Sequence, residues 1–343
     1  MGDANGAGHR APTMGDVAKI AGVSHQTVSR VLNGYHWVSQ EAKESVLEAV
    51  EKLGYRRNMA ARALASKESK IIGTVVTDTQ LSGPSGTLLG IEQAAHEAGY
   101  WVSVASMQLV DETGMTRAVN HFIDQGADGI AVIAPNKIAL DSAAKAVENT
   151  PMVLVTSGST KEYDLPYLDI DQKLGARLAV RHLIELGHVH IAHFSGPRSD
   201  FHALERIAGW QLELAEHGLP AEVLFDGAWD ATTGYELAQK LLQSEKKLPT
   251  AVFAANDQLA IGALRAFGEA GLRIPEDISV VGFDDILGTE QLRPPLTTIR
   301  QDHTTLGRIS VEMLLTLIGG GTPECGFIPP TLVRRASSGP ARS

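Results

Sequence analysis

The sequence holds one cysteine, Cys325, among 343 residues, so no disulfide bond can form within the chain. Long apolar runs are absent too, because Gly, Pro or a charged residue interrupts each hydrophobic stretch within about ten residues, and a membrane-spanning helix needs about twenty. Residues 1–11 are rich in Gly and Ala and lack the apolar segment of a signal peptide. These absences predict a cytoplasmic protein that begins with a disordered leader.

Sequence motifs of common enzyme chemistry are missing as well. The chain contains no Gly-x-Gly-x-x-Gly motif and no phosphate-binding Gly-rich motif, and Ser-Gly-Pro-Ser-Gly at 82–86 lacks the spacing of a nucleophile elbow. His188, His190 and His193 lie close in sequence, but a strand would turn the third away from the first two. His188 follows Gly187 at an expected helix end, where we expect a surface position. We therefore expect no enzyme, no catalytic residue, no metal and no cofactor.

The net charge of −10 is unevenly distributed along the chain. Residues 1–70 carry ten Lys and Arg against seven Asp and Glu, which gives +3, whereas the remaining 273 residues carry twenty against thirty-three, which gives −13. A nucleic-acid binder needs positive charge only where it touches the phosphates. The basic amino-terminal part is thus a candidate for nucleic-acid binding.

Three short helices are predicted in this basic part. Thr13 and Asp16 form a capping box before apolar residues at helical spacing (Val17, Ile20 and Ala21), and Gly22 ends that helix. Ser24 caps a second helix in which Val28, Val31 and Leu32 share one face. A third helix over 40–53, ended by Gly54, presents Val46, Leu47, Val50 and Leu53 to a small core. This is a helix-turn-helix pattern.

The polar face of the second helix has chemistry suited to the major groove of DNA. Gln pairs with adenine, Arg grips guanine through two hydrogen bonds, and hydroxyl groups reach phosphates. His25, Gln26 and Arg30 are the expected base readers, although such a face can also be simply solvated. The expected DNA contacts on this helix are Ser24, His25, Gln26, Thr27, Ser29, Arg30 and Asn33.

The segments GDVAKIAGVSHQTVSRVLNG and VSQEAKESVLEAVEKLGYRRNMAARALASK closely resemble the headpiece of the lactose repressor family. The resemblance implies that the second helix enters the major groove and that residues 58–66 become a hinge helix when two subunits meet on operator DNA. It adds Asn58, Ala61 and Leu64 to the expected contacts, with Leu64 wedged into the minor groove, where an apolar side chain unstacks a base step. Without the family, this segment is too short to be a stable helix in water and can be a simple linker.

Beyond residue 70, apolar strand-like runs alternate with amphipathic helices, which indicates parallel sheets. The runs lie at 71–76, 101–105, 129–134, 152–155, 190–194, 251–255 and 278–283. Their number fits two doubly wound subdomains with a ligand cleft at the carboxyl ends of the strands. DQKLGARLAVRHLIELGHVHIAHFSGP, AANDQLAIGALRA and IPEDISVVGFDD resemble the family's core, so the resemblance extends over nearly the whole chain and implies a periplasmic-binding-protein-like α/β fold.

By that resemblance, Arg206, Asn256 and Asp284 match positions that bind polar groups of an effector. Arg supplies a fork of donors, Asp accepts from vicinal hydroxyls and Asn does both, while Trp229 can stack on a sugar face. Gln301 is retained from the family pattern and completes the expected site. Each residue also has a plain structural alternative: Asn256 as a helix cap, Asp284 as the cap of a turn and Trp229 as core.

Two departures put the effector's identity in doubt. Thr156, Ser157 and Gly158 stand where the lactose repressor offers an acidic side chain to its sugar, and His303 replaces an aromatic wall. The residues from 336 to 343 show no heptad pattern for a tetramerising coiled coil, so a homodimer is favoured.

The complete prediction is a dimeric, ligand-responsive repressor of operator DNA whose small-molecule effector is a sugar. A purine-type corepressor that strengthens DNA binding is the main alternative; a sugar-binding protein without DNA regulation is a further one. The expected parts are a leader (1–11), a helix-turn-helix headpiece (12–57), a hinge helix and linker (58–70), a first core subdomain (71–168 with 302–329) and a second (169–301 with 330–340).

Overall fold

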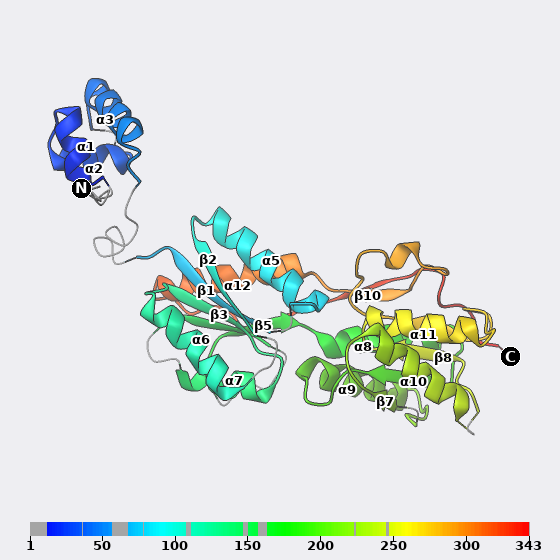
Figure 1. The fold of residues 1–343 in the computed structure, drawn as a ribbon. Helices are drawn as coiled ribbons and strands as arrows, with labels where there is room; N and C mark the ends of the chain where they lie inside the picture. The colour runs from blue at the N-terminus through cyan, green and yellow to red at the C-terminus, as the bar shows by residue number, and fades with distance from the viewer. Residues whose placement is uncertain are drawn as a thin grey trace, which may run out of the picture. The chain divides into compact units, whose positions relative to one another are not determined.

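The computed structural model describes residues 12–35, 37–56, 68–77, 79–107, 111–146, 150–156, 163–222, 224–244 and 247–342. The chain divides into two compact units, Met1–Ser69 and Lys70–Ser343. We call them the headpiece unit and the core unit, and describe each by itself (Figure 1).

The headpiece unit contains α1 (Met14–Ala21), α2 (His25–Leu32) and α3 (Gln40–Leu53). Thr13 and Asp16 form the predicted capping box, and Gly22 ends α1 in the left-handed conformation. Ser24 caps α2, and Gly54 ends α3. All three predicted helices are therefore confirmed.

The core of the headpiece unit is small. Val17, Val28 and Val46 are fully buried, and two alanines, Ala18 and Ala49, are buried beside them. The prediction that Leu47 closes this core was wrong, because 49% of its surface is exposed, and Ile20 is also 46% exposed. The small alanine side chains let α1 and α3 approach closely, so their larger neighbours turn toward solvent.

The core unit contains two parallel sheets (Figure 1). The first has six strands in the order β11-β5-β4-β3-β1-β2. Its strands are β1 (Ile71–Thr77), β2 (Trp101–Met107), β3 (Gly129–Ile133), β4 (Met152–Val155), β5 (Tyr167–Ile170) and β11 (Gly326–Ile328). Its helices are α5 (Ser82–Glu97) and α12 (His303–Ile318) on one face, and α6 (Glu112–Asp124) and α7 (Lys137–Ala146) on the other. Neighbouring residues of β1 point to opposite faces of the sheet. Val76 packs with α5 and α12 on one face, and Val75 packs with α6 on the other.

The second sheet has four strands in the order β7-β6-β8-β9. Its strands are β6 (Ile191–Ser195), β7 (Leu224–Asp226), β8 (Ala251–Ala254) and β9 (Ser279–Val281). Helices α8 (Gln172–Glu185) and α9 (Phe201–Glu216) cover one face, and α10 (Ala231–Gln243) and α11 (Asp257–Glu269) cover the other. A short 3-10 helix, Thr289–Gln291, and an antiparallel pair, β10 (Thr298–Arg300) with β12 (Thr331–Val333), lie beside this sheet.

The chain passes between the two sheets three times. It leaves the first sheet after β5, returns through α12 after β10, and leaves again after β11. This topology confirms the predicted fold class, a helix-turn-helix headpiece with a core of two doubly wound parallel-sheet subdomains. The exact subdomain boundaries stay a prediction.

Helices α5 and α12 cross very closely at a pair of glycines. A Cβ atom added to Gly307 would lie 2.3 Å from the carbonyl carbon of Gly90. No side chain fits there, so these two glycines bring the first turns of α12 against the middle of α5.

The expectation of a surface position for His188 was wrong. Its side chain is 1% exposed, with Nδ1 2.8 Å from Thr250 Oγ1 and Nε2 3.0 Å from the Gly339 carbonyl oxygen. The carboxyl-terminal segment covers this imidazole, and burial lowers its pKa. The sequence around His188 shows no sign of that distant segment.

No helix in the described ranges is long and apolar enough to cross a membrane.

Candidate functional site

The predicted DNA-reading residues lie on α2 in the headpiece unit. His25, Gln26 and Arg30 are exposed, opposite the buried Val28. Ser24 and Thr27 form the N-terminal cap of the helix. Ser24 Oγ accepts from the Thr27 amide at 3.1 Å and lies 2.9 Å from Thr27 Oγ1. The helix thus presents side chains with base-reading chemistry on its open face.

Of the remaining predicted DNA contacts, Asn33 lies among the described residues and the three hinge residues do not. Asn33 is exposed, and its Nδ2 donates to Ser29 Oγ at 3.3 Å. Asn58, Ala61 and Leu64 lie outside the described residues, so the hinge and its wedge stay predictions.

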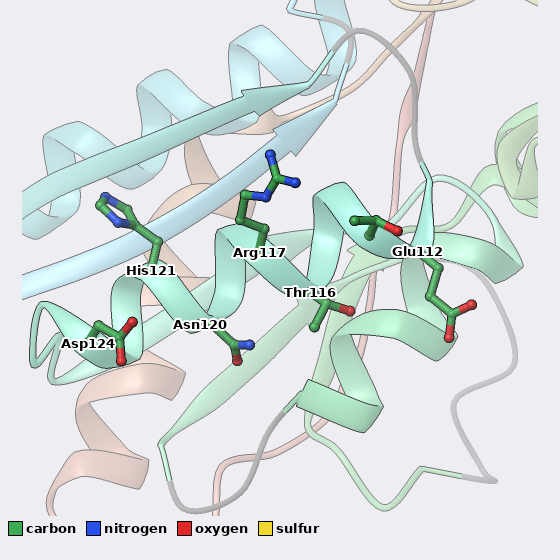
Figure 2. A pocket seen from close by; sticks show the side chains of 7 residues that line it. Glu112, Thr116, Arg117, Asn120, His121 and Asp124 are labelled. Atoms are coloured by element: carbon green, nitrogen blue, oxygen red, sulfur yellow. The ribbon is translucent and has the colours of Figure 1, made fainter.

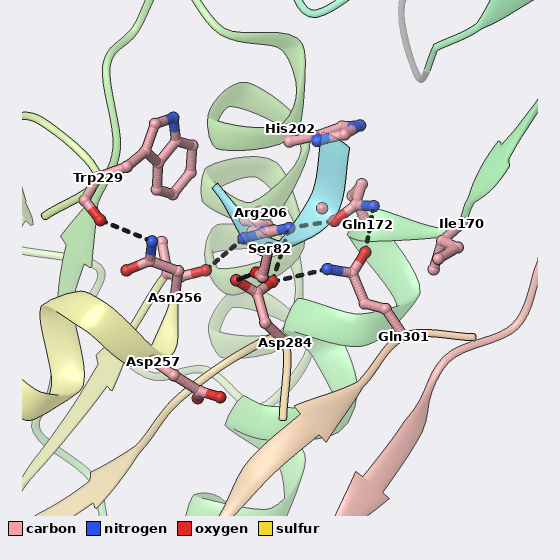
Figure 3. Close-up of polar contacts among 12 residues, drawn as sticks. Ser82, Ile170, Gln172, His202, Arg206, Trp229, Asn256, Asp257, Asp284 and Gln301 are labelled. Atoms are coloured by element: carbon pink, nitrogen blue, oxygen red, sulfur yellow. Dashed lines mark hydrogen bonds and ion pairs between the residues drawn. The ribbon is translucent and has the colours of Figure 1, made fainter. Parts of the chain in front are cut away.

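In the core unit, polar side chains meet where the strands of both sheets end (Figure 3). We call this set the junction cluster; it consists of Ser82, Gln172, Arg206, Trp229, Asn256, Asp284 and Gln301. Five of its members are the predicted effector residues, which the fold brings together from distant parts of the sequence. Ser82 and Gln172 were not predicted. The chain positions of all seven fit the rule that ligands of such folds bind at carboxyl strand ends.

Arg206 is the buried cation of the cluster, with 3% of its surface exposed. Its Nε donates to Gln172 Oε1 at 2.9 Å, and Nη1 donates to the Ala255 carbonyl. Nη2 lies 3.7 Å from Asp284 Oδ1. The guanidinium carbon lies 3.8 Å from the centre of the Phe283 ring and 5.4 Å from that of Trp229. These contacts hold the guanidinium plane in one orientation.

Asp284 is the anion opposite. Its Oδ2 accepts from Ser82 Oγ at 2.9 Å, and Oδ1 accepts from Gln301 Nε2 at 2.7 Å. The backbone at Asp284 has a φ of +116°, which is unusual for a residue with a side chain. Because Ser82 begins α5 on the first sheet, its bond to Asp284 links the two subdomains.

Asn256 and Trp229 also have the structural roles that were considered for them, Asn256 as a helix cap and Trp229 in part as a core residue. Asn256 caps α11, with Oδ1 accepting from the Leu259 amide at 2.8 Å, and its Nδ2 donates to the Trp229 carbonyl at 2.9 Å. The Trp229 ring packs against Gly196 and the second sheet's apolar core. The Asn256 side-chain amide has two N–H donors, and these bonds use one of them.

A second link between the subdomains lies beside the cluster and was not predicted. His202, on α9, has Nε2 2.8 Å from Asp169 Oδ2, on β5 of the first sheet. Asp169 is 2% exposed. Burial lowers the pKa of His202, but the Asp169 carboxylate outweighs this effect, so the pKa is raised overall.

Asp257, a buried carboxyl next to the cluster, was not predicted either. It accepts from Thr298 Oγ1 at 2.6 Å and from the Ile286 amide at 2.9 Å. Burial, reinforced by the nearby Asp284 charge, raises the pKa of Asp257 to about 8. The carboxyl therefore braces the turn that carries Asp284.

A shallow hollow of about 580 Å³ lies elsewhere, along α6 (Figure 2). Its lining residues are Glu112, Thr113, Thr116, Arg117, Asn120, His121 and Asp124. All come from one helix, whose opposite face buries Met115, Val119 and Phe122. The hollow is thus the solvated face of an amphipathic helix and includes none of the predicted effector residues.

Comparisons with known families and proteins agree with this architecture. Residues 13–58 match the model of bacterial regulatory proteins of the lacI family, and residues 180–338 match the periplasmic binding protein-like domain. The lactose operon repressor of Escherichia coli K12 is 37% identical over 332 residues, which cover 95% of this chain and 90% of that protein. The transcriptional repressor PurR of Haemophilus influenzae is 35% identical over 89% of this chain and 91% of its own length.

Solved structures show the same likeness. The lac repressor dimer bound to operator and the anti-inducer ONPF matches with a TM-score of 0.89 and 35% identity, over 96% of this chain and 100% of that one. The complex of the regulator CelR with cellobiose matches with a TM-score of 0.72 and 29% identity, over 95% and 99%. The similarity to these relatives extends over both the headpiece unit and the core unit, and the chain belongs to the lacI family of bacterial regulatory proteins.

Proposed function

We propose that this protein is a transcriptional repressor that binds operator DNA through α2 and is controlled by a small polar effector at the junction cluster. The exposed row of His25, Gln26 and Arg30 on a capped, well-packed helix carries the DNA-binding part. Membership of a family of regulatory proteins supports it, as does a relative solved on its operator.

The repressor acts as a twofold dimer in this proposal. One recognition helix reads each half-site of a roughly palindromic operator, and the two hinge segments pair at its centre. Leu64 from each subunit wedges into the minor groove there, where unstacking a base step bends the duplex.

The effector binds where Arg206, Asn256 and Asp284 meet. The guanidinium and amide offer donors and the carboxylate offers acceptors, which together suit the adjacent hydroxyl groups of a carbohydrate. The structure of the relative CelR with cellobiose favours this class. The alternative is a purine corepressor that strengthens operator binding, and repressors named PurR are among the similar proteins.

Effector binding reaches the DNA through the links between the subdomains. Ser82–Asp284 and His202–Asp169 join the two sheets next to the proposed site, so a ligand there favours one relative placement of the subdomains over another. The two placements differ in the separation of the two hinge starts near Ser69. The ligand shifts the population between them by an amount set by its differential affinity for the two states.

A binding selection with the full chain tests the DNA-reading part. Duplexes selected from a randomised pool serve as probes for Arg30→Ala, with Lys52→Ala on α3 as a control that removes the same charge elsewhere. Losing a base contact weakens specific binding by about 1–3 kcal/mol and relaxes the preference at one base pair. Equal, sequence-independent losses in both variants contradict base reading by Arg30.

The same selected duplex then tests the effector. Lactose, cellobiose, galactose, glucose, adenine and hypoxanthine are added in turn, and the dissociation constant for DNA is measured at fixed salt. A carbohydrate that weakens binding supports induction. A purine that strengthens binding supports the corepressor alternative.

A further inference from the structure

The first side chain of α9 crosses the junction between the two subdomains. Phe201 packs against the apolar cluster that lies between the first sheet and helices α6 and α7. Every other described residue of that cluster lies in the range 71–167, within the first subdomain. Farther along α9, Trp210 and Leu214 are fully buried in the core of the second subdomain. One helix is therefore anchored in the second subdomain and places its first side chain in the first.

A backbone hydrogen bond fixes the point at which α9 meets the first subdomain. The Phe201 amide donates to the Pro135 carbonyl oxygen at 2.8 Å, just after the end of β3. The first amides of a helix have no acceptor within the helix. Asp200 Oδ1 accepts from the next two, those of His202 and Ala203, at 2.8 and 3.3 Å. The amide of Phe201 thus has its acceptor in the other subdomain.

The surface against which Phe201 packs belongs to a firm core. Ala139 and Leu140 of α7 are 0% and 1% exposed. Tyr163 borders the same cluster, and its hydroxyl donates to Asp141, also on α7. A closely packed core of this kind does not collapse into a space that a side chain leaves. Removing the Phe201 ring therefore exposes apolar surface on both subdomains.

The three links across the junction differ in place and in chemistry. Ser82 begins α5 on one face of the first sheet, Asp169 lies on β5, and Phe201 packs on the face that α6 and α7 cover. The bonds of Ser82 with Asp284 and of Asp169 with His202 are polar, and water can replace either partner when the subdomains separate. Water offers no such replacement for a buried ring. The contact of Phe201 therefore opposes separation in a way that the polar links do not.

We propose that Phe201 is a latch that sets the balance between the placement of the subdomains described here, which we call closed, and an open one. In the closed placement the ring lies in the α6–α7 cluster and the amide bonds to Pro135. Opening breaks both contacts. Arg206 lies five residues farther along α9, so a movement of the first turns of this helix also moves the guanidinium. The latch goes beyond the proposed function, because it depends neither on the identity of the effector nor on DNA.

The test measures the separation of the subdomains in the full, ligand-free chain. Cys325→Ser removes the exposed native cysteine, and Asn120→Cys on α6 and Lys240→Cys on α10 place spin labels at exposed positions of the two subdomains. An excess of unlabelled chain ensures that double electron–electron resonance measures distances within one chain. We expect one dominant distance in this parent chain. Phe201→Ala should raise the ratio of open to closed placements roughly tenfold, because a partly buried aromatic ring no longer opposes opening.

Hydrogen exchange detects an open population that is too small for the distance measurement. The amide of residue 201 bonds to the other subdomain, so in Phe201→Ala it should exchange roughly tenfold faster, as read by mass spectrometry of short peptides. The amides of β8 inside the second sheet should exchange at the parent rate.

Phe225→Ala is the matched control. It removes the same ring from the second subdomain's own core, where Phe225 packs edge-on against Phe194, so both measurements should stay at the parent values. Phe201→Leu keeps an apolar side chain at the latch and should give an intermediate result.

Unchanged distances together with unchanged exchange at residue 201 in Phe201→Ala overturn the proposal, as does an equal change in Phe225→Ala. If circular dichroism shows that Phe201→Ala does not fold, Phe201→Leu carries the same comparison, and parent values in that variant overturn the latch. Operator binding enters neither measurement, so failure of the proposed repressor function is distinguished from failure of the latch.

Discussion

The two sides of the junction differ in how they are built. On the second subdomain, Arg206, Asn256 and Asp284 lie on or beside strand ends and are held by neighbours such as the Ala255 carbonyl and Gln301. On the first subdomain, Ser82 and Asp169 find their partners across the boundary. The second side is therefore held largely by contacts within its own subdomain, whereas the contacts of the first side depend on where the other subdomain lies. Under the proposed function, the second side binds the effector and the first side transmits the change.

The largest effect should follow from breaking the preformed side. Asp284→Ala leaves the buried Arg206 guanidinium without its carboxylate, and an uncompensated buried charge costs about 3–5 kcal/mol. Urea unfolding of the full chain measures this loss of free energy.

Asp226→Ala is the matched control, because it removes a carboxylate from an exposed pair with Arg198. Exposed pairs contribute about 0–1 kcal/mol. If the two variants lose equal stability, the second side does not depend on compensation of Arg206.

A smaller, pH-dependent effect should follow from Asp169→Asn. The folded-state pKa of His202 is raised above its unfolded value near 6.5, so its pairing stabilises fully below that pH and is lost as the pH rises through the folded pKa. The variant should lose about 1.5–3 kcal/mol near pH 6 and less near pH 8.5, as measured by urea unfolding at each pH.

Asp230→Asn serves as the control for this pH dependence, since Asp230 caps α10 and Asn caps a helix equally well. A loss from Asp169→Asn that stays constant between pH 6 and 8.5 would show that the His202 charge takes no part in the link.

The smallest effect should come from Ser82→Ala. Asp284 keeps its bond from Gln301, so only one neutral-donor bond across the boundary is lost, worth about 0.5–1.5 kcal/mol. Ser85→Ala removes a hydroxyl that bonds to Leu81 within the same segment, and it controls for the change in α5. The effector response should change in Ser82→Ala alone; an equal change in both variants would contradict transmission through Ser82.

Local signals made the headpiece highly predictable. The caps Thr13 and Ser24 and the terminating glycines Gly22 and Gly54 act within a few residues, so the boundaries of all three helices followed from sequence. The burial of Ala49 in preference to Leu47 did not, because it depends on how closely α1 and α3 approach.

Strands were predicted where an apolar run is continuous. Strands β1 to β4, β6, β8 and β9 correspond to the seven predicted runs. The other five, β5, β7, β10, β11 and β12, have three or four residues and are stabilised by pairing with distant strands. These five lack the continuous apolar run that marks equally short strands such as β4 and β8, so they cannot be recognised alone.

The candidate site also contains residues that could be predicted from the sequence and residues that could not. Resemblance and side-chain chemistry pointed to Arg206, Asn256 and Asp284, which the fold brings together. The contacts of Ser82 and Asp169 depend on how one subdomain faces the other. Sequence spacing cannot reveal these relations, because Ser82 and Asp284 lie 202 residues apart and Asp169 and His202 lie on different sheets.

The three passages between the sheets also bear on how the protein is made. The first sheet needs α12 and β11 to cover one face and complete one edge, yet these elements are translated only after most of the second subdomain. The half that leaves the ribosome first is thus still incomplete when most of the other half has been made. We expect a nascent chain that has reached residue 300 to hold its first sheet open, with the part of one apolar face that α12 covers still exposed for chaperones to bind.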